Sequence, residues 1–500
     1  MIIKMIIIII IFENADIVKR LNFRILHFLI FKGNLVEFFI KVDFRTAMFY
    51  VEFMEKNLTS GNVLKNIAYF SLPYVVSYFL QTLYGLADLY IIGRFDGVAE
   101  ITAVSIGSQI MHMLTVMIVG LAMGSTVVIA RAIGAKQNEK AAKAITNTAF
   151  LFMGVSVVLT VILLVCVKPI VSVMATPTEA VAGTAAYLTV CFIGIPFITA
   201  YNVLSSIFRG LGDSKSPMYF ITVACIVNII LDYLFIGYFN MGTVGAALGT
   251  TLSQAINVIF VLVVILKKKI GIKIAKGDFS LQPEICKQVF RIGVPISLQD
   301  GFIQIAFIVI TIIANMRGLN DAAAVGIVEK IIGFVFLVPS SMLSTVSAIS
   351  AQCIGAQKHK RASITLFYGT AICIIYGLIM VGIVELFSEP IVGLFMKEKS
   401  QEVLILGGQY LRGYIWDCIF AGIHFCFSGY FCAYGKSEIS FIHNFLSIVC
   451  VRVPGAYFGS KYFATTLFPM GLAAPLGSLL SVVICIFAYI FNFFCARQIP

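Results

Sequence analysis

Long apolar stretches separated by short polar links make up most of the chain. From residue 66 onward, twelve stretches have the length of roughly 20 to 30 residues that a tilted helix needs to cross the hydrocarbon core of a membrane. They lie at 66–94, 100–132, 144–168, 184–208, 217–238, 243–266, 288–316, 322–354, 364–388, 404–432, 438–459 and 470–495. The pattern predicts an all-α polytopic membrane protein with twelve transmembrane helices.

Polar residues interrupt the first stretch at helical spacing. They follow one another at intervals of four, three and four residues and so form one stripe along a helix: Ser77, Gln81, Tyr84 and Asp88. A carboxylate inside a membrane helix is costly, so it usually faces a bundle interior or a wet cavity and marks an ion or substrate path. The alternative is that Asp88 lies near the outer end of its span, paired with Arg94.

Pro73 lies in the same span, fifteen residues before Asp88. Proline frees a backbone carbonyl and permits a helix to bend. We therefore expect Pro73 to be the position at which this helix bends.

The fifth stretch carries a second acid. Asn228 and Asp232 are four residues apart and therefore stack on one helix face. A carboxylate beside an amide is an oxygen-rich site for a hard cation or for a shared proton. Thr250 and Thr251 in the sixth stretch can add hydroxyl groups, although a threonine in a membrane helix often bonds to its own backbone. The alternative for Asp232 is an exposed position at the outer lip of its span.

The second half of the chain carries different polar residues. Its first span has a stripe that includes Asp300 and Gln304, and later spans contain Glu329, Asp417 and Arg452. We expect Arg452 to be buried against a carboxylate or carbonyl groups, because a lone cation in a span is costly. Glu385 lies next to a solvated span end. The candidate residues for a substrate cavity are Gln81, Asp300, Gln304, Glu329 and Asp417.

The two halves repeat one another. ARAIGAKQ at Ala130 returns as AQCIGAQK at Ala351, and Tyr187-Leu188 returns as Tyr410-Leu411, at offsets of 221 and 223. Each half holds six spans, an even number, so both halves enter the membrane from the same side and are parallel repeats. The predicted organisation is a six-helix lobe over 54–266, a basic cytoplasmic link over 267–287 that ends in a surface helix, and a second six-helix lobe over 288–500.

Residues 1–53 differ from the rest, because they mix Ile, Phe and Lys without a stable helical period. From Met54 the sequence resembles a natural protein start, so we interpret residues 1–53 as a non-native or dispensable extension and Met54 as the initiator. The alternative is a genuine N-terminal anchor.

Composition and charge agree with a membrane protein. The chain is 60% hydrophobic and 12% charged, whereas a soluble globular chain carries roughly 25% charged residues. Eighteen Lys and Arg residues lie in one set of alternating links and seven in the other, which places the first set and both termini in the cytoplasm of a plasma-membrane protein. The net charge of +12 is distributed over these links rather than gathered in a patch for nucleic acid.

Other chemistries find little support in the sequence. The twelve cysteines are scattered without a CxxC pair, and no HExxH motif is present. GYFCAYGKS at Gly429 has one residue too many for a Walker loop. We expect no enzyme activity, metal cofactor or nucleotide, so uphill work must come from an ion gradient or a partner.

An ordered set of motifs between Leu58 and Arg497 resembles the multidrug and toxic compound extrusion (MATE) transporters. The set comprises LTSGN, LQTLYGLADLYIIGR, ARAIGAK, YLTVCFIGIP, FRGLGDSKSP, NIILDYLFI and MGTVGAALGT. The resemblance implies twelve helices in two lobes around a central cavity that faces outward and inward in turn. It also implies a monomer that exports cationic or amphipathic organic compounds in exchange for H⁺ or Na⁺.

The resemblance also suggests roles for single residues. Asp88 is similar to the family's first-helix acid, with Tyr84 and Pro73 as its neighbours, and Asn228 and Asp232 match the fifth-helix pair. Thr250 is a looser match to a sixth-helix hydroxyl, and Asp417 to a tenth-helix acid. Gly85 departs from the Asn of many members, and the seventh-helix Glu has no clear counterpart near Asp300 or Gln304.

These residues suggest a coupling mechanism. Two acids close together in a low dielectric resist joint ionisation, so Asp88 and Asp232 can take up one proton outside and lose it inside. The same oxygens, with Asn228, can hold Na⁺ instead. The alternatives are a transporter of lipid-linked or other biosynthetic intermediates, which would use cationic groups such as Arg452 to meet phosphate, and a membrane-embedded enzyme or receptor.

Overall fold

The computed structural model describes residues 57–174, 176–267, 272, 275–396 and 400–491. The interpretation of residues 1–53 and of Met54 lies outside these ranges. Within them the protein is helical throughout, and no strand is found.

The first half forms six membrane-crossing segments. Its long helices follow the apolar stretches because an apolar helix satisfies every backbone group internally where no water is available. The elements are α6 (Val63–Phe95), α7 (Val98–Gly134), α8 (Asn138–Val165), the short α9 (Val167–Val173), α10 (Val181–Ile193), α11 (Ile195–Gly210), α12 (Lys215–Asp232) with the π-helical turn η1 (Tyr233–Tyr238), and α13 (Gly242–Lys267).

The second half repeats this order after a 3₁₀ turn, η2 (Lys276–Phe279). It also contains a π-helical turn in its fifth segment, as the first half does. Its elements are α14 (Pro283–Asn315), α15 (Leu319–Val335), α16 (Leu337–Gly355), α17 (His359–Gly393), α18 (Gln401–Tyr414), α19 (Asp417–Ala433), α20 (Ser437–Ser447), η3 (Ile448–Arg452), α21 (Val453–Tyr462) and α22 (Phe468–Tyr489).

The predicted number of spans is confirmed for the described part of the chain. Eleven helical segments are long and apolar enough to cross a membrane, and α10 with α11 makes a twelfth that is bent by 49°. Most helix ends differ from the predicted ones by a few residues, and at α14 the difference changes the organisation of the link. Helix α14 begins at Pro283, so the surface helix predicted in the link and the seventh span are one continuous helix. Proline at the first helical position suits this start because its missing N–H would be unpaired there.

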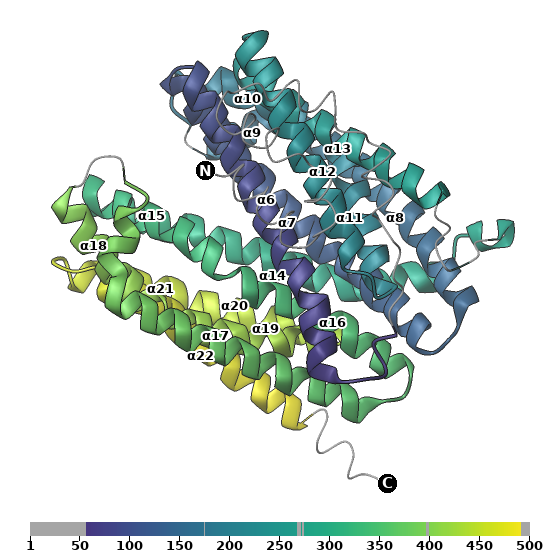
Figure 1. Ribbon diagram of the computed structural model, residues 1–500. Coiled ribbons are helices and arrows are strands. Elements are labelled where there is room, and N and C mark those ends of the chain that lie inside the picture. Colours follow the sequence, from purple (N-terminus) through teal and green to yellow (C-terminus); the bar gives the residue numbers. More distant parts are fainter. Residues whose placement is uncertain (1–56, 175, 268–271, 273–274, 397–399, 492–500) are drawn as a thin grey trace, which may run out of the picture.

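The two halves form two lobes that meet at one end and diverge toward the other (Figure 1). The first helix of each half packs on the other half: α6 contacts α16, and α14 contacts α7. Each lobe also has its own apolar core, one built from α6–α13 and the other from α14–α22. This reciprocal packing is what two parallel repeats related by a two-fold axis produce.

The lobes are held together at the end where α6 begins and α22 ends. Arg131 Nε donates to the Ala433 carbonyl at 2.9 Å, and Gln352 Nε2 donates to the Gly210 carbonyl at 3.3 Å. Arg361 Nη2 donates to the Ser60 carbonyl at 2.8 Å. All three hydrogen bonds join one half of the chain to the other, so this end is closed.

Two repeat-equivalent glycines allow the backbones to touch there. A Cβ on Gly134 would collide with the Gln352 carbonyl, and one on Gly355 would collide with the Arg131 carbonyl. The two glycines occupy the same place in the repeated IGA motif, 221 residues apart. The sequence repeat thus includes the close contact between the lobes.

Candidate functional site

Three helices of the first lobe bring together the residues predicted for ion coupling. Helix α6 supplies Tyr84 and Asp88, α12 supplies Asn228 and Asp232, and α13 supplies Thr250. Asp88 is 2% exposed and Asp232 is fully buried. The alternatives that placed either acid at an exposed span end are therefore wrong. Arg94, which one alternative paired with Asp88, is itself exposed.

A continuous set of polar contacts joins these side chains. Thr250 Oγ1 donates to Asp88 Oδ2 at 3.1 Å, and Asn228 Nδ2 donates to Asp232 Oδ1 at 3.3 Å. The Tyr84 hydroxyl lies 3.1 Å from the Thr250 carbonyl and 2.8 Å from Ser253 Oγ. The carboxyl groups of Asp88 and Asp232 lie within hydrogen-bonding reach of each other. We call these five predicted residues the acid pair cluster.

The acid pair cluster leaves buried oxygens without a donor. Among the described residues, no donor reaches Asp88 Oδ1, Asp232 Oδ2 or Asn228 Oδ1. Carboxylate and amide oxygens accept hydrogen bonds and do not donate them. Two carboxyl groups in contact therefore need a proton or a small hard cation between their oxygens, and the oxygen donor set suits either ion.

Gly249 gives Asp232 its position. A Cβ at Gly249 would overlap the Asp232 carboxylate, so α12 and α13 can approach closely at this point only with glycine there.

The other predicted residues of α6 lie on the same helix but outside this cluster. Gln81 is half-buried and lies near Tyr201 of α11. Pro73 lies inside α6, which continues through it as one helix, and Ser77 Oγ bonds back to the Pro73 carbonyl at 2.8 Å. A bend at Pro73 during transport stays a prediction.

The second lobe has a different polar cluster at its core. Thr311 Oγ1 donates to both Glu329 oxygens, at 3.1 and 3.2 Å. Arg452 Nη2 lies 3.8 Å from Asp417 Oδ2 and also donates to the Tyr414 hydroxyl. We call these residues the arginine cluster. The expectation that Arg452 is buried against a carboxylate is confirmed.

Two candidates for the cavity lie apart from both clusters. Asp300 lies against Gly120 of α7, at the contact between the lobes. Gln304, one turn later on α14, is half-buried. The structure therefore does not bring Asp300 together with Asp417, although both were predicted to line one cavity, because the stripe on α14 faces two different neighbours along its length.

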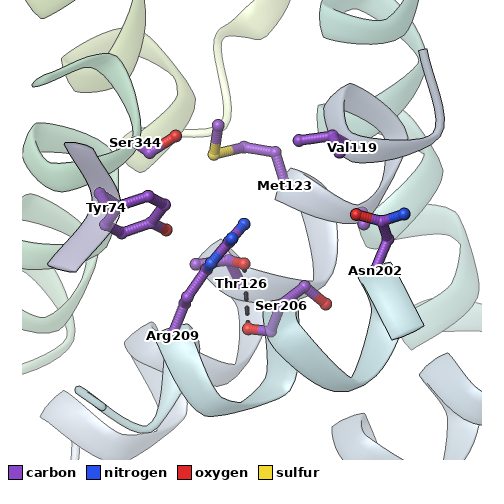
Figure 2. A pocket seen from close by; sticks show the side chains of 9 residues that line it. Tyr74, Val119, Met123, Thr126, Asn202, Ser206, Arg209 and Ser344 are labelled. Carbon is purple, nitrogen blue, oxygen red and sulfur yellow. Dashed lines mark hydrogen bonds between the residues drawn. The ribbon is translucent and has the colours of Figure 1, made fainter. Parts of the chain in front are cut away.

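A small pocket that the sequence did not indicate lies where the lobes meet (Figure 2). Its main polar group is Arg209, at the end of α11, which is 7% exposed. Arg209 is one of the eighteen Lys and Arg residues predicted to lie in the links, and the structure corrects this by placing it inside a helix under α6. The pocket is lined by Tyr74, Val119, Ala122, Met123, Thr126, Asn202, Ser206, Arg209 and Ser344.

Comparison with known proteins places this arrangement in context. A family model described as MatE matches residues 73–234 and 295–458, one match in each half. The chain is 29% identical over 409 residues to a probable multidrug resistance protein, YoeA, of Bacillus subtilis, covering 80% of this chain and 88% of the relative. It is 25% identical to the multidrug export protein MepA of Staphylococcus saprophyticus, covering 81% and 89%.

A solved structure has the same fold. A crystal structure of MATE in complex with MaL6 superposes with a TM-score of 0.80 at 25% identity, covering 88% of this chain and 98% of that one. The superposition spans both lobes.

Proposed function

The chain belongs to the MatE family of multi-pass membrane transporters, and we propose that it exports cationic or amphipathic organic compounds in exchange for an incoming ion, H⁺ or Na⁺. Its relatives are named as multidrug resistance and export proteins. The observation that carries the coupling proposal is the contact between the two buried carboxyl groups of Asp88 and Asp232.

The acid pair cluster favours the proton as the coupling ion. One proton between Asp88 and Asp232 supplies the missing donor and leaves a single negative charge, which Asn228 and Thr250 already partly solvate. Loss of that proton puts two negative charges side by side in a low dielectric, which is unfavourable unless the helices move apart or a cation enters. Proton loss can therefore be linked to a rearrangement of α6 against α12 and α13.

The closed end of the molecule, where hydrogen bonds join the two lobes, suggests how access to the cavity alternates. The bonded end of the lobes carries the links richer in Lys and Arg, which supports assigning it to the cytoplasm, and on this proposal the state with that end closed is outward-facing. In this state the acid pair takes a proton from outside and substrate leaves. Return to the inward state delivers the proton to the cytoplasm and lets substrate enter. Linkage requires that substrate binding and proton release favour each other.

The alternative, transport of a lipid-linked intermediate, was expected to use cationic groups in the cavity to meet phosphate, with Arg452 as the main candidate within a span. The Arg452 guanidinium instead lies against Asp417 and Tyr414. Its charge is compensated within the lobe, so we favour export of organic compounds by a monomer in the plasma membrane.

Dye export from vesicles tests the proposal. Purified protein is reconstituted, the vesicles are loaded with the organic cation rhodamine 123, and export is followed under a pH gradient alone and then under a Na⁺ gradient alone. We expect export under the pH gradient in the wild type and in Glu385→Gln, a carboxylate at a solvated helix end that contacts Trp416, and none in Asp88→Asn. Undiminished export by Asp88→Asn would remove the acid pair from the mechanism, and export driven by Na⁺ alone would reassign the ion.

A further inference from the structure

A buried cation without an acidic partner lies where the two lobes meet. Arg209 is 7% exposed, and its guanidinium carbon lies 4.4 Å from the centre of the Tyr74 ring. The described residues offer it no ion pair and no hydrogen bond, and the ionisable groups near it are tyrosines, with the Tyr74 ring in direct contact. This sets Arg209 apart from Arg452, whose charge is met by Asp417.

The guanidinium points into the small pocket with hydroxyl and amide groups around it. Figure 2 shows Arg209 directed between Tyr74 on one side and Thr126 and Ser206 on the other. Ser344 reaches the same pocket from α16 of the second lobe. The pocket is thus built by both lobes, and a ligand in it contacts both.

An unpaired guanidinium in this place needs acceptors. Arg stays charged in proteins and presents five N–H donors in a planar fork. A buried charge is costly unless it is paired and hydrogen-bonded, and a tyrosine face satisfies none of the donors at the edge of the fork. The fork matches the two oxygens of a carboxylate. The complementary ligand is therefore an anionic group with two oxygens.

The size and lining of the pocket indicate one functional group of a larger molecule. The cavity volume is about 10 Å³, which is room for one small group, whereas pockets that bury a whole drug-sized ligand measure roughly 300–1,000 Å³. Val119, Ala122 and Met123 form an apolar side next to the charge. A free inorganic anion has no use for that apolar side, whereas an amphipathic substrate has an apolar body to place against it.

We propose that the Arg209 pocket binds the carboxylate of an amphipathic substrate, so that the transporter selects molecules carrying an acid group, zwitterions among them, over the corresponding simple cations. The proposal rests on the proposed export function, because it names the substrate class of that function. It assigns Arg209 a role in specificity and leaves ion coupling to Asp88 and Asp232.

Two dyes that differ by one methyl ester test the site. Rhodamine 110 carries a free carboxylate, and rhodamine 123 is its methyl ester. Binding of each dye to the full chain in phosphatidylcholine nanodiscs is measured by fluorescence polarisation. We expect Arg209→Gln to bind rhodamine 110 at least about tenfold more weakly than the wild type does, the effect of losing one charge-assisted hydrogen bond. Rhodamine 123 should change by less than about twofold, because it carries no carboxylate for Arg209 to bind.

Two further variants separate charge from structure. Arg209→Lys keeps the charge but not the fork, so its affinity for rhodamine 110 should fall between those of the wild type and Arg209→Gln. Lys215→Gln removes a positive charge nearby, over the Tyr69 ring, and should bind both dyes as the wild type does. A merely structural role for Arg209 would weaken both dyes equally, which would overturn the proposal.

Other outcomes also contradict it. If the wild type binds neither dye, or binds both equally well, it lacks the proposed selectivity for a carboxylate and the proposal is wrong. Competition against rhodamine 110 by equimolar acetate would reassign the pocket to a free anion, and competition by phosphatidic acid added to the nanodiscs would reassign it to a lipid phosphate. Export of rhodamine 123 is measured separately. If the protein binds rhodamine 110 more tightly than rhodamine 123 but exports no dye, only the export function is contradicted. If it exports rhodamine 123 but does not discriminate between the two dyes, only this site is contradicted.

Discussion

The two lobes have matching helices but different charged groups between them: two acids in the first lobe, and acids together with Arg452 in the second. Gly249 and Thr250 in α13 correspond to Gly477 and Ser478 in α22 of the second lobe. They lie in the repeated segments MGTVGAALGT and MGLAAPLGS. In the first lobe Gly249 faces Asp232 and Thr250 bonds Asp88. In the second lobe Gly477 faces Ser447 and Arg452, and Arg452 Nη2 lies 3.8 Å from Asp417 Oδ2.

This difference supports the proposal that the coupling ion binds in the first lobe. In the arginine cluster Arg452 supplies a counter-charge for Asp417, so this pair can stay buried without a proton or Na⁺ from outside. The acid pair cluster has two acids and no cation among the described residues, so its charge is balanced only when an ion arrives. We therefore assign coupling to the first lobe and a fixed structural role to the arginine cluster.

The largest expected effect comes from exchanging acid for amide in each lobe. Asp232→Asn should reduce gradient-driven export to the level of empty vesicles, because the pair can no longer exchange a proton. Asp417→Asn should slow export through altered packing around Arg452 but keep its dependence on the pH gradient. Rates from dye-loaded vesicles at several gradients measure both. Loss of gradient dependence in Asp417→Asn would mean that the second lobe couples as well.

Removing the internal cation should mainly affect stability. Arg452→Gln leaves Asp417 buried without its partner, which typically costs about 3–5 kcal/mol. The double variant Arg452→Gln with Asp417→Asn should recover part of that loss, because neither charge then remains. Thermal unfolding in detergent gives the order wild type, double variant, single variant. Equal melting of the single variant and the wild type would show that the pair contributes nothing.

Filling the two equivalent glycines should affect the lobes unequally. Gly249→Ala overlaps the Asp232 carboxylate and forces it to move, at a cost of about 1–3 kcal/mol typical of overpacking. Gly477→Ala meets the tip of the Ser447 side chain at 2.9 Å, which can rotate away, so the expected loss is smaller. Melting temperatures and export rates of the two variants test this order. A greater loss for Gly477→Ala would contradict it.

The smallest effect concerns one tyrosine hydroxyl in each lobe. Tyr84→Phe removes the hydroxyl that lies on Thr250 and Ser253, and Tyr376→Phe removes the one that donates to the Val335 carbonyl at 3.1 Å. Each should lower stability by about 1 kcal/mol, as for a single hydrogen bond. Only Tyr84→Phe should also shift the pH profile of export. The same shift in both variants would indicate a general effect of packing.

Local periodicity predicted only part of the acid pair cluster, because Asn228 and Asp232 share a helix face at a spacing of four residues. Their grouping with Asp88 and Thr250 came from the resemblance to MATE transporters, and the structure brings these side chains together. Span number and parallel repeats followed from length and from repeated motifs.

The remaining features depend on neighbours that one chain segment does not reveal. Arg209 stands beside a polar link, and only the packing of α6 over α11 shows that it is buried. Asp300 and Thr311 lie on one helix, yet the first faces α7 and the second faces Glu329. The π-helical turns beside Asp232 and at Arg452 have no sequence signal of their own.

Proton release on substrate binding tests most directly the assignment of coupling to the first lobe. Rhodamine 123 is added to the protein in weakly buffered detergent solution near neutral pH, and a pH indicator reports the protons released per dye bound. We predict release of about one proton for the wild type and for Asp417→Asn, and none for Asp88→Asn, because binding and proton release are linked through one pair. Release by Asp88→Asn together with none by Asp417→Asn would place the coupling site in the second lobe and contradict the assignment.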